Sequence, residues 1–467
     1  MCANSESMGL RSWLRRLSAE GLLLEVRERV SASYEVSEFC MQHDGVPLLF
    51  HAVDGEHRVA MNVLGSRELL SKLFGVPKEQ LAAFLAEIPT DGLQSSVRVV
   101  EDSETKAFAR EPDLRELPIL RHFKSDGGAY ITAGVVVAEL DGVSNASFHR
   151  MLVLDERRLA VRLVPSRHLY NMYREARERS EELRVGVAIG VDPFLLLAAA
   201  TRVPRGKEFE YAAALKRAAG LEGEVELFRL RNGVAVPHAE FVLEGFFGGD
   251  AAKEGPFVDI TGTYDVVREE PVLTLTRIYH RKDPIYHAIL PSGGEHRLLM
   301  GVPYEPLIFK AVGRVTRVKN VVLTDGGCCY LHAVIQIRKG GEGEAKNACI
   351  AAFAAHPSLK LAVVVDEDVN IYDVRDVEYA VATRVRWDRD VVLIPNVRGS
   401  SLDPSSENGL TTKVGIDATK KGDARKYERV GANIQHANIQ HANTQDANNN
   451  AIAHKRRWTK LNFISKD

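Results

Sequence analysis

The stretch that decides the fold is ITAGVVVAELDGVSNASFHRMLVLDERRLAVRL, residues 131–163. It contains three segments rich in Val, Leu and Ile, at residues 132–139, 151–155 and 159–163, joined by short polar turns. Short, closely spaced apolar segments with turn residues between them favour a β-barrel or a β-sandwich. We therefore expect a β-rich core in the middle of the chain, with further strands at 225–230 and 272–280 and helices at 169–184 and 211–219.

Alternating helices and strands are predicted on both sides of this core. On the N-terminal side, Leu10, Trp13, Leu14 and Leu17 recur at helical spacing and Gly21 follows as a cap. Strands at 22–26, 47–50 and 58–64 then lead to helices that begin at Ser66 and Lys78. On the C-terminal side, helices at 344–355 and 374–381 alternate with strands at 320–324, 331–337, 361–365 and 391–394.

These patterns predict a mixed α+β chain of three domains and a tail. The domains are an N-terminal α/β domain at 1–118, a central β-barrel domain at 119–305 and a C-terminal α/β domain at 306–425. Residues 426–467 contain Ala-Asn-Ile-Gln-His twice within a polar low-complexity segment. Such a segment cannot bury a core, so we expect the tail to be disordered.

Composition indicates a small-molecule substrate and a reducing compartment. The 61 Lys and Arg nearly cancel the 63 Asp and Glu, so charge gives no reason to expect a nucleic-acid or anionic-membrane partner. The five cysteines form neither an even disulfide set nor a Cys-x-x-Cys pair. No apolar run approaches the roughly 20 residues that span a bilayer. We expect a cytoplasmic protein.

Four carboxylates lie among apolar residues and glycines: Glu240, Glu244, Glu254 and Asp259. Burial raises the pKa of a carboxyl group toward the range in which it donates a proton at neutral pH. For Glu240 and Glu244, a strand face with ion-pair partners explains the pattern as well as function does. Glu254 and Asp259 flank Gly255-Pro256, where a tight turn lets side chains converge on a cleft.

A second cluster is Asn145, Arg150 and the later His168. An amide, an imidazole and a carboxylate together suit Mg²⁺ or Mn²⁺, which commonly bridge to a phosphate. Each residue also has an ordinary explanation, since Asn145 can cap a turn, Arg150 can form a surface pair and His168 can begin a helix.

Over most of residues 9–420 the chain resembles the UbiD family of decarboxylases, which use prenylated FMN. The resemblance rests on DGGAYIT (126–132), Asn145 with Arg150, VAIGVDP (187–193), the acidic segments 239–245 and 254–262, RKDPIY (281–286), VVDEDV (364–369) and KVGIDAT (413–419). It implies that the central domain is a split β-barrel that binds flavin. It also implies assembly into dimers or hexamers and a flavin prenyltransferase as the supplier of the cofactor.

The resemblance assigns roles to individual residues. Asn145, His168 and Glu210 match the family's ligands for Mn²⁺ (or Mg²⁺) at the flavin phosphate, and a nearby K⁺ is typical. Glu208 is the alternative to Glu210, but the spacing to Glu254 favours Glu210. Further contacts to the flavin phosphate are expected from Arg167, His168 and Thr201.

Arg150, Glu254 and Asp259 match the family's catalytic network. Decarboxylation of an unsaturated acid leaves electrons in an orbital without resonance stabilisation, so a cofactor must accept them. Arg150 would orient the substrate carboxylate, Glu254 would hold the guanidinium, and Asp259 would protonate the carbon after CO₂ leaves.

Three interpretations of the substrate stay open. We favour trans-anhydromevalonate 5-phosphate, converted to isopentenyl phosphate in an archaeal mevalonate pathway. The second is an aromatic acid such as 4-hydroxy-3-polyprenylbenzoate. The third is a flavin-binding split barrel without decarboxylase activity, which the intact Arg-Glu-Asp set argues against.

Overall fold

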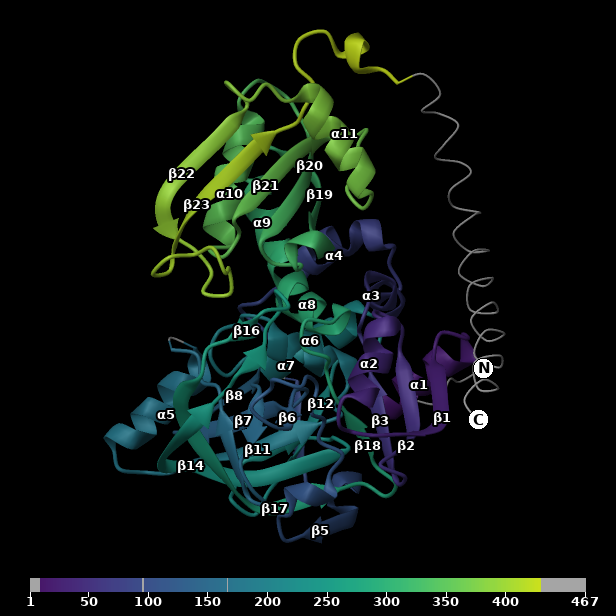
Figure 1. The fold of residues 1–467 in the computed structure, drawn as a ribbon, viewed down its shortest axis with the longest axis vertical. Helices are drawn as coiled ribbons and strands as arrows, with labels where there is room; N and C mark the ends of the chain where they lie inside the picture. Colours follow the sequence, from purple (N-terminus) through teal and green to yellow (C-terminus); the bar gives the residue numbers. More distant parts are fainter. Residues whose placement is uncertain (1–8, 95, 166, 430–467) are drawn as a thin grey trace, which may run out of the picture. The chain divides into compact units, whose positions relative to one another are not determined.

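The computed structural model describes residues 9–94, 96–165 and 167–429 (Figure 1). The described residues up to 419 form one compact unit, and the described residues 420–429, which belong to a second unit, hold only the short 3₁₀ turn Ala424–Tyr427. The repeat-containing part of the predicted tail, residues 430–467, lies outside the described residues.

A four-stranded sheet with order β1-β2-β3-β18 organises the N-terminal part. Its strands are β1 (Leu24–Val30), β2 (Leu48–Val53), β3 (His57–Met61) and β18 (Ile285–His287). The accompanying helices are α1 (Leu10–Ala19), α2 (Glu35–Gln42), α3 (Arg67–Phe74) and α4 (Leu81–Glu87). The predicted cap is confirmed, since the Ser66 side chain accepts a hydrogen bond from the Leu69 amide at the start of α3.

A nine-stranded sheet forms the centre, with order β6-β9-β10-β17-β14-β11-β7-β8 and β5 paired to β17. Figure 1 draws β14 and β17 as its two long arrows. The strands are β5 (Phe108–Arg110), β6 (Tyr130–Ile131), β7 (Val135–Leu140), β8 (Val143–Phe148), β9 (Met151–Val153), β10 (Arg158–Val161), β11 (Leu183–Ile189), β14 (Phe241–Glu254) and β17 (Arg268–His280).

Three helices and a small sheet accompany this centre. The helices are α5 (His168–Glu178), α6 (Pro193–Ala200) and α7 (Glu208–Ala218), and the small sheet has order β13-β12-β4. Its strands are β4 (Val97–Val100), β12 (Val225–Arg229) and β13 (Ala235–Pro237). Helix α6 is apolar and is buried over seven of its eight residues, which makes it an internal support for the elements around it.

The C-terminal part is a five-stranded sheet of order β19-β20-β21-β23-β22. Its strands are β19 (Arg317–Leu323), β20 (His332–Arg338), β21 (Leu361–Asp366), β22 (Val391–Arg398) and β23 (Leu410–Asp417). The helices are α8 (Gly294–Gly301), α9 (Glu305–Gly313), α10 (Glu344–Ala355) and α11 (Val374–Arg384). The two β21 ladders, to β20 and β23, are parallel, as the predicted strand–helix alternation requires.

A buried ion pair joins the N-terminal helices to this last part. Arg67 Nη1 lies 2.8 Å from Glu305 Oε2, and the two side chains are only 11% and 1% exposed. Arg67 also donates to the Leu323 carbonyl, and the Leu323 amide donates to Glu305. Every charge and backbone group in this cluster therefore has a partner.

The predicted mixed α+β class is confirmed, with differences in detail. The helix predicted over 169–184 ends at Glu178, because the chain reverses at Ser180, which has a φ of 58°. The elements that were not predicted include strands β8, β11, β14 and β23 and helices α2, α6, α8 and α9. Strand β18 lies far along the sequence but pairs with β3 of the N-terminal sheet. The domain boundaries at 118, 305 and 425 stay a prediction.

No described helix has the length and apolar character that crossing a bilayer would need.

Candidate active site

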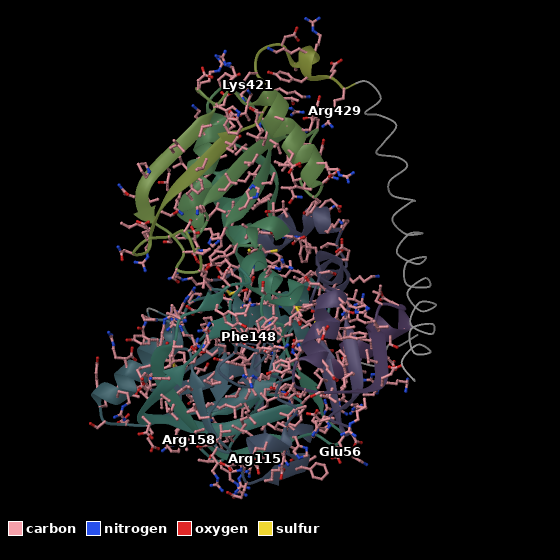
Figure 2. All side chains as sticks on the ribbon, viewed as in Figure 1. Glu56, Arg115, Phe148, Arg158, Lys421 and Arg429 are labelled. Atoms are coloured by element: carbon pink, nitrogen blue, oxygen red, sulfur yellow. The ribbon has the colours of Figure 1, made fainter. Side chains whose placement is uncertain are left out.

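Arg150 and Glu254 form a buried, two-point ion pair at the end of the central sheet. Arg150 follows β8, whose last residue Phe148 is labelled in Figure 2, and Glu254 ends β14. Nε and Nη2 of Arg150 lie 2.9 Å from Oε1 and Oε2 of Glu254. The arginine side chain is 10% exposed and the glutamate 0%. This fork-to-carboxylate geometry fixes the plane of the guanidinium.

A small hairpin brings two more carboxylates to the same guanidinium. Strands β15 (Phe257–Val258) and β16 (Tyr264–Asp265) pair with each other after the turn at Gly255-Pro256. Asp259 Oδ2 lies 3.4 Å from Arg150 Nη1, and Asp265 Oδ2 lies 3.0 Å from Nη2. The predicted convergence of Glu254 and Asp259 around this turn is therefore present, whereas Asp265 was missed.

The neighbours of Arg150 keep it charged. Burial lowers its pKa, but the hydrogen bonds and negative charge of Glu254, with Asp265 and Asp259, outweigh burial and raise it. The centre of the Arg150 guanidinium also lies 4.8 Å from the ring centroid of Phe257. The positive charge is thus permanent, shielded from water and fixed in direction.

Two further residues that the sequence did not reveal border this network. His296 lies close enough to Asp259 and Arg150 for their charges to act on it, and burial lowers its pKa. Tyr130 is fully buried, and its hydroxyl accepts a hydrogen bond of 3.1 Å from the Gly255 amide beside Glu254. Only their place in the folded chain relates them to the site.

A second cluster forms around Glu208, at the start of α7. The Asn145 amide nitrogen donates to Glu208 Oε1 at 2.8 Å, and His168 Nδ1 lies 3.6 Å from the same oxygen. Asn145 belongs to β8 and His168 is the first residue of α5, so three elements meet here. Among the described residues no three His, Cys, Asp or Glu side chains form a metal-ligand group. The cluster around Glu208 instead contains one Glu, one His and the side-chain amide of Asn145.

The Glu208 carboxylate has the character expected of a cation ligand. It is 3% exposed, and its Oε2 is buried without a hydrogen-bond partner among the described residues. Burial raises the pKa of Glu208 to about 7, against the lowering effect of its hydrogen bonds, which include that from Asn145. A buried carboxylate with an unpaired oxygen is costly unless a cation or a proton compensates it. The residues therefore fit a divalent cation.

The preference for Glu210 over Glu208 is corrected by this geometry. Glu210 Oε1 binds Lys207 Nζ at 2.8 Å, and it is Glu208 that reaches Asn145 and His168. Residues two apart on a helix point in different directions, so only one of the two can face the cluster. Spacing to Glu254 along the chain cannot show which one it is.

The two remaining predicted cofactor contacts lie at helix ends. Arg167 is the exposed residue that precedes α5, next to His168. Thr201 follows α6, and its hydroxyl donates to the Leu197 carbonyl at 2.7 Å, which leaves its oxygen able to accept. Their contacts to a phosphate stay a prediction.

Glu240 and Glu244 have structural partners. Glu240 accepts from Arg11 at 2.8 and 2.7 Å and from the Ile285 amide at 3.0 Å, which ties α1 to the central sheet. Glu244 accepts from the Tyr279 hydroxyl at 2.8 Å. The ion-pair explanation of the strand face therefore accounts for Glu240, and a hydrogen-bonded strand position accounts for Glu244.

Comparison with known proteins identifies the family. Residues 14–88, 97–294 and 297–418 match the N-terminal, Rift-related and C-terminal domains of 3-octaprenyl-4-hydroxybenzoate carboxy-lyase, the three domain models of UbiD. The chain belongs to the UbiD family. Within it, the chain is 56% identical to the anhydromevalonate phosphate decarboxylase of Methanosarcina mazei, over 88% of this chain and 96% of that protein. The protein of the same name from Aeropyrum pernix is 41% identical, over 91% of this chain and 96% of that protein.

Solved structures of UbiD-class enzymes share the fold. HmfF from Pelotomaculum thermopropionicum, in complex with FMN, superposes with a TM-score of 0.86 and is 37% identical, over 91% of this chain and 97% of that one. An evolved dimeric form of HmfF, in complex with prenylated FMN, gives 0.83. The resemblance to the UbiD family seen in the sequence is therefore confirmed over nearly the whole compact unit.

Proposed function

We propose that this UbiD-family chain is a carboxy-lyase that uses prenylated FMN to decarboxylate trans-anhydromevalonate 5-phosphate to isopentenyl phosphate. The observation that carries the reaction type is the buried Arg150–Glu254 pair with Asp259 beside it. The substrate assignment is supported by relatives at 41–56% identity that are named anhydromevalonate phosphate decarboxylase.

Arg150 orients the substrate carboxylate. Its Nε and Nη2 are engaged by Glu254 and Asp265, while Nη1 has only the long 3.4 Å contact to Asp259 among the described residues. A guanidinium offers five N–H groups, so Nη1 retains a donor for the carboxylate of a bound acid. Because the plane of the guanidinium is fixed by Glu254, the substrate is held in one orientation.

Asp259 delivers the proton. It is the most exposed of the three carboxylates around Arg150, at 18%, against 16% for Asp265 and 0% for Glu254. An acid at the edge of a buried network can reach both a substrate carbon and a source of protons. Glu254 stays paired with Arg150 and keeps the guanidinium in place.

When bound, prenylated FMN supplies the electron sink that amino-acid side chains lack. Asn145, His168 and Glu208 would hold Mn²⁺ (or Mg²⁺) at the flavin phosphate, with Arg167 and Thr201 as further contacts and K⁺ as an additional ion. A flavin nucleotide carries its phosphate and its ring at opposite ends. Asn145 and Arg150, at the two ends of the segment 145–150, would serve one end each.

An aromatic acid is the second candidate substrate. Vanillic acid decarboxylase from Sedimentibacter hydroxybenzoicus shares the fold with a TM-score of 0.80 at 26% identity, so this fold also accommodates an aromatic acid in a relative. The Arg-Glu-Asp network does not distinguish the two substrates, since both present a carboxylate next to a double bond.

The test is a decarboxylation assay on the holoenzyme. The full chain is co-expressed with a flavin prenyltransferase and incubated with trans-anhydromevalonate 5-phosphate, vanillate or 4-hydroxybenzoate, and CO₂ and products are measured. We expect CO₂ and isopentenyl phosphate from the first acid, and none from protein that holds unmodified FMN. Release of CO₂ from the aromatic acids alone would assign an aromatic acid as the substrate instead. No release of CO₂ from any of the acids would refute the proposed decarboxylase activity.

Assembly and location follow from the same proposal. We expect the protein to be cytoplasmic. We also expect a homo-oligomer, either a dimer or a hexamer, and one solved relative is described as an evolved dimeric form. Sedimentation equilibrium of the purified chain distinguishes the two, and a monomer would contradict the expectation.

A further inference from the structure

A short polar chain lies behind the Asn145 side chain. Ser147 Oγ lies 3.0 Å from Asn145 Oδ1 and 3.0 Å from Nε2 of His149. His149 Nδ1 in turn lies 2.8 Å from the carbonyl oxygen of Arg162. Alternate residues of a strand share a face, so Asn145 and Ser147 of β8 point the same way.

The orientation of the Asn145 amide follows from its other contact. Its nitrogen donates to Glu208 Oε1 at 2.8 Å, and a carboxylate oxygen can only accept. The carbonyl oxygen Oδ1 must therefore be the atom that faces Ser147.

The protonation of His149 follows in the same way. The Arg162 carbonyl can only accept, so Nδ1 of His149 carries a hydrogen. Burial, with the positive charges of Arg167 and Arg162, lowers the pKa of His149 to about 4, so the ring is neutral near pH 7. A neutral ring with its hydrogen on Nδ1 has a lone pair on Nε2, and that lone pair needs a donor.

The backbone that fixes His149 is itself anchored. Arg162 pairs with Glu270 of β17, and Glu270 also accepts from the Leu163 amide at 3.1 Å. Glu270 is only 4% exposed. The Arg162 carbonyl is thus held by β10 and β17 together, and it holds the ring of His149.

Ser147 has one hydroxyl hydrogen and two acceptors that compete for it: Nε2 of His149 and Oδ1 of Asn145. If the hydrogen goes to Asn145, it takes one of the two lone pairs of the oxygen that a cation would need. If it goes to His149, Oδ1 keeps its lone pairs and the buried Nε2 is satisfied. A cation bound to Asn145 Oδ1 and the need of His149 Nε2 for a donor therefore favour the same position of the Ser147 hydrogen, toward His149.

We propose that His149 is a positioning residue for the metal centre: it takes the Ser147 hydrogen, which leaves the Asn145 carbonyl oxygen available to a divalent cation. This rests on the proposed centre of Asn145, His168 and Glu208. Hydrogen-bond partners of metal ligands typically change metal affinity about 10–100-fold when they are removed.

The test is Mn²⁺ binding, measured without turnover. Metal-depleted full-length protein is titrated with Mn²⁺, and free Mn²⁺ is followed by electron paramagnetic resonance. We expect the Kd to rise about 10–100-fold in His149→Phe, because the Ser147 hydrogen then turns to Asn145. Ser147→Ala, which has no such hydrogen, should bind Mn²⁺ as wild type does. Ser147→Thr, which keeps a hydroxyl, should stay close to wild type. Ser144→Ala, on the other face of β8, is the matched control and should bind as wild type does.

Each outcome decides the proposal. Because the loss in His149→Phe acts through the Ser147 hydrogen, the double variant Ser147→Ala/His149→Phe should recover the wild-type affinity. A double variant as weak as His149→Phe, or a loss in Ser147→Ala, would overturn the assignment of the hydrogen to His149. A loss of melting temperature with unchanged Mn²⁺ affinity would make the role merely structural. Wild-type protein that binds no Mn²⁺ would refute the metal centre itself, and the positioning role with it.

Discussion

Replacement of one glutamate of α7 should remove metal binding, and replacement of its neighbour should not. The pair is Glu208→Gln and Glu210→Gln, which differ by two positions and by nothing in chemistry. Glu208 is buried beside Asn145 and His168 with Oε2 unpaired, whereas Glu210 pairs with Lys207, whose side chain is 43% exposed. Both glutamates are buried, at 3% and 9% exposure, so the two variants isolate the contacts of Glu208 with Asn145 and His168.

The expected magnitudes follow from these environments. Removal of one partner from a buried charge pair costs about 3–5 kcal/mol, which corresponds to a loss of roughly 10²–10⁴-fold in the affinity for Mn²⁺. An ion pair with an exposed lysine is worth about 0–1 kcal/mol, so Glu210→Gln should change the affinity by less than about fivefold. The two Kd values should thus differ by more than tenfold.

The assay is a Mn²⁺ titration of metal-depleted protein, repeated with saturating FMN so that the flavin phosphate can complete the site. Melting temperatures of both variants show whether the fold is intact. Loss of binding in Glu210→Gln with retention in Glu208→Gln would refute the assignment from the structure and restore the choice made from spacing. Equal, small effects would show that neither glutamate is a ligand.

Three further results are expected. Glu254→Gln and Asp259→Asn should each lower decarboxylation at least ~10²-fold while the flavin absorbance of the purified protein is kept, and full turnover in either variant would contradict its role. Arg67→Met should lower the free energy of unfolding in urea by about 3–5 kcal/mol, because it leaves the charge of Glu305 buried and unpaired. The control is Arg338→Met, whose partner Glu367 is 39% exposed, and it should lower this free energy by less than about 1 kcal/mol. The free energy of unfolding should also fall as the pH drops from 6.5 toward 4. Burial lowers the pKa of three histidines to about 4, so in this range the unfolded chain binds more protons than the folded one, and each histidine contributes at most roughly 3 kcal/mol. An unfolding midpoint that stays constant across this pH range would contradict the expectation. These histidines are His149, His332 and His356.

Local pattern was sufficient where a residue's neighbours in sequence are also its neighbours in space. The apolar spacing of Leu10 to Leu17 produced α1, Ser66 capped α3, and α10 occupies the predicted residues 344–355. In each case hydrogen bonds and side-chain contacts within about four residues decide the structure. The ordered motifs of the chain likewise led to the UbiD family, which the comparisons confirm.

The candidate site was only partly predictable. Arg150, Glu254 and Asp259 were chosen from the resemblance and do converge, but Asp265, His296 and Tyr130 carry no local mark of function. Strand β14 was also missed, although it places Glu254. Its pairing partner β17 begins only after the β15–β16 hairpin, so the contacts that stabilise it are not local.

The sequence by itself determined the class of the fold, most of the helices and strands, and the family, because these depend on periodicity and on short ordered motifs. Only the tertiary structure decided which carboxylate of α7 faces Asn145, which acids surround Arg150, and that β18 completes the N-terminal sheet. The physical reason is that these contacts join segments about 60 to more than 200 residues apart. Which side chain faces such a contact depends on how the distant segments pack together, and the spacing of residues along the sequence does not specify this packing.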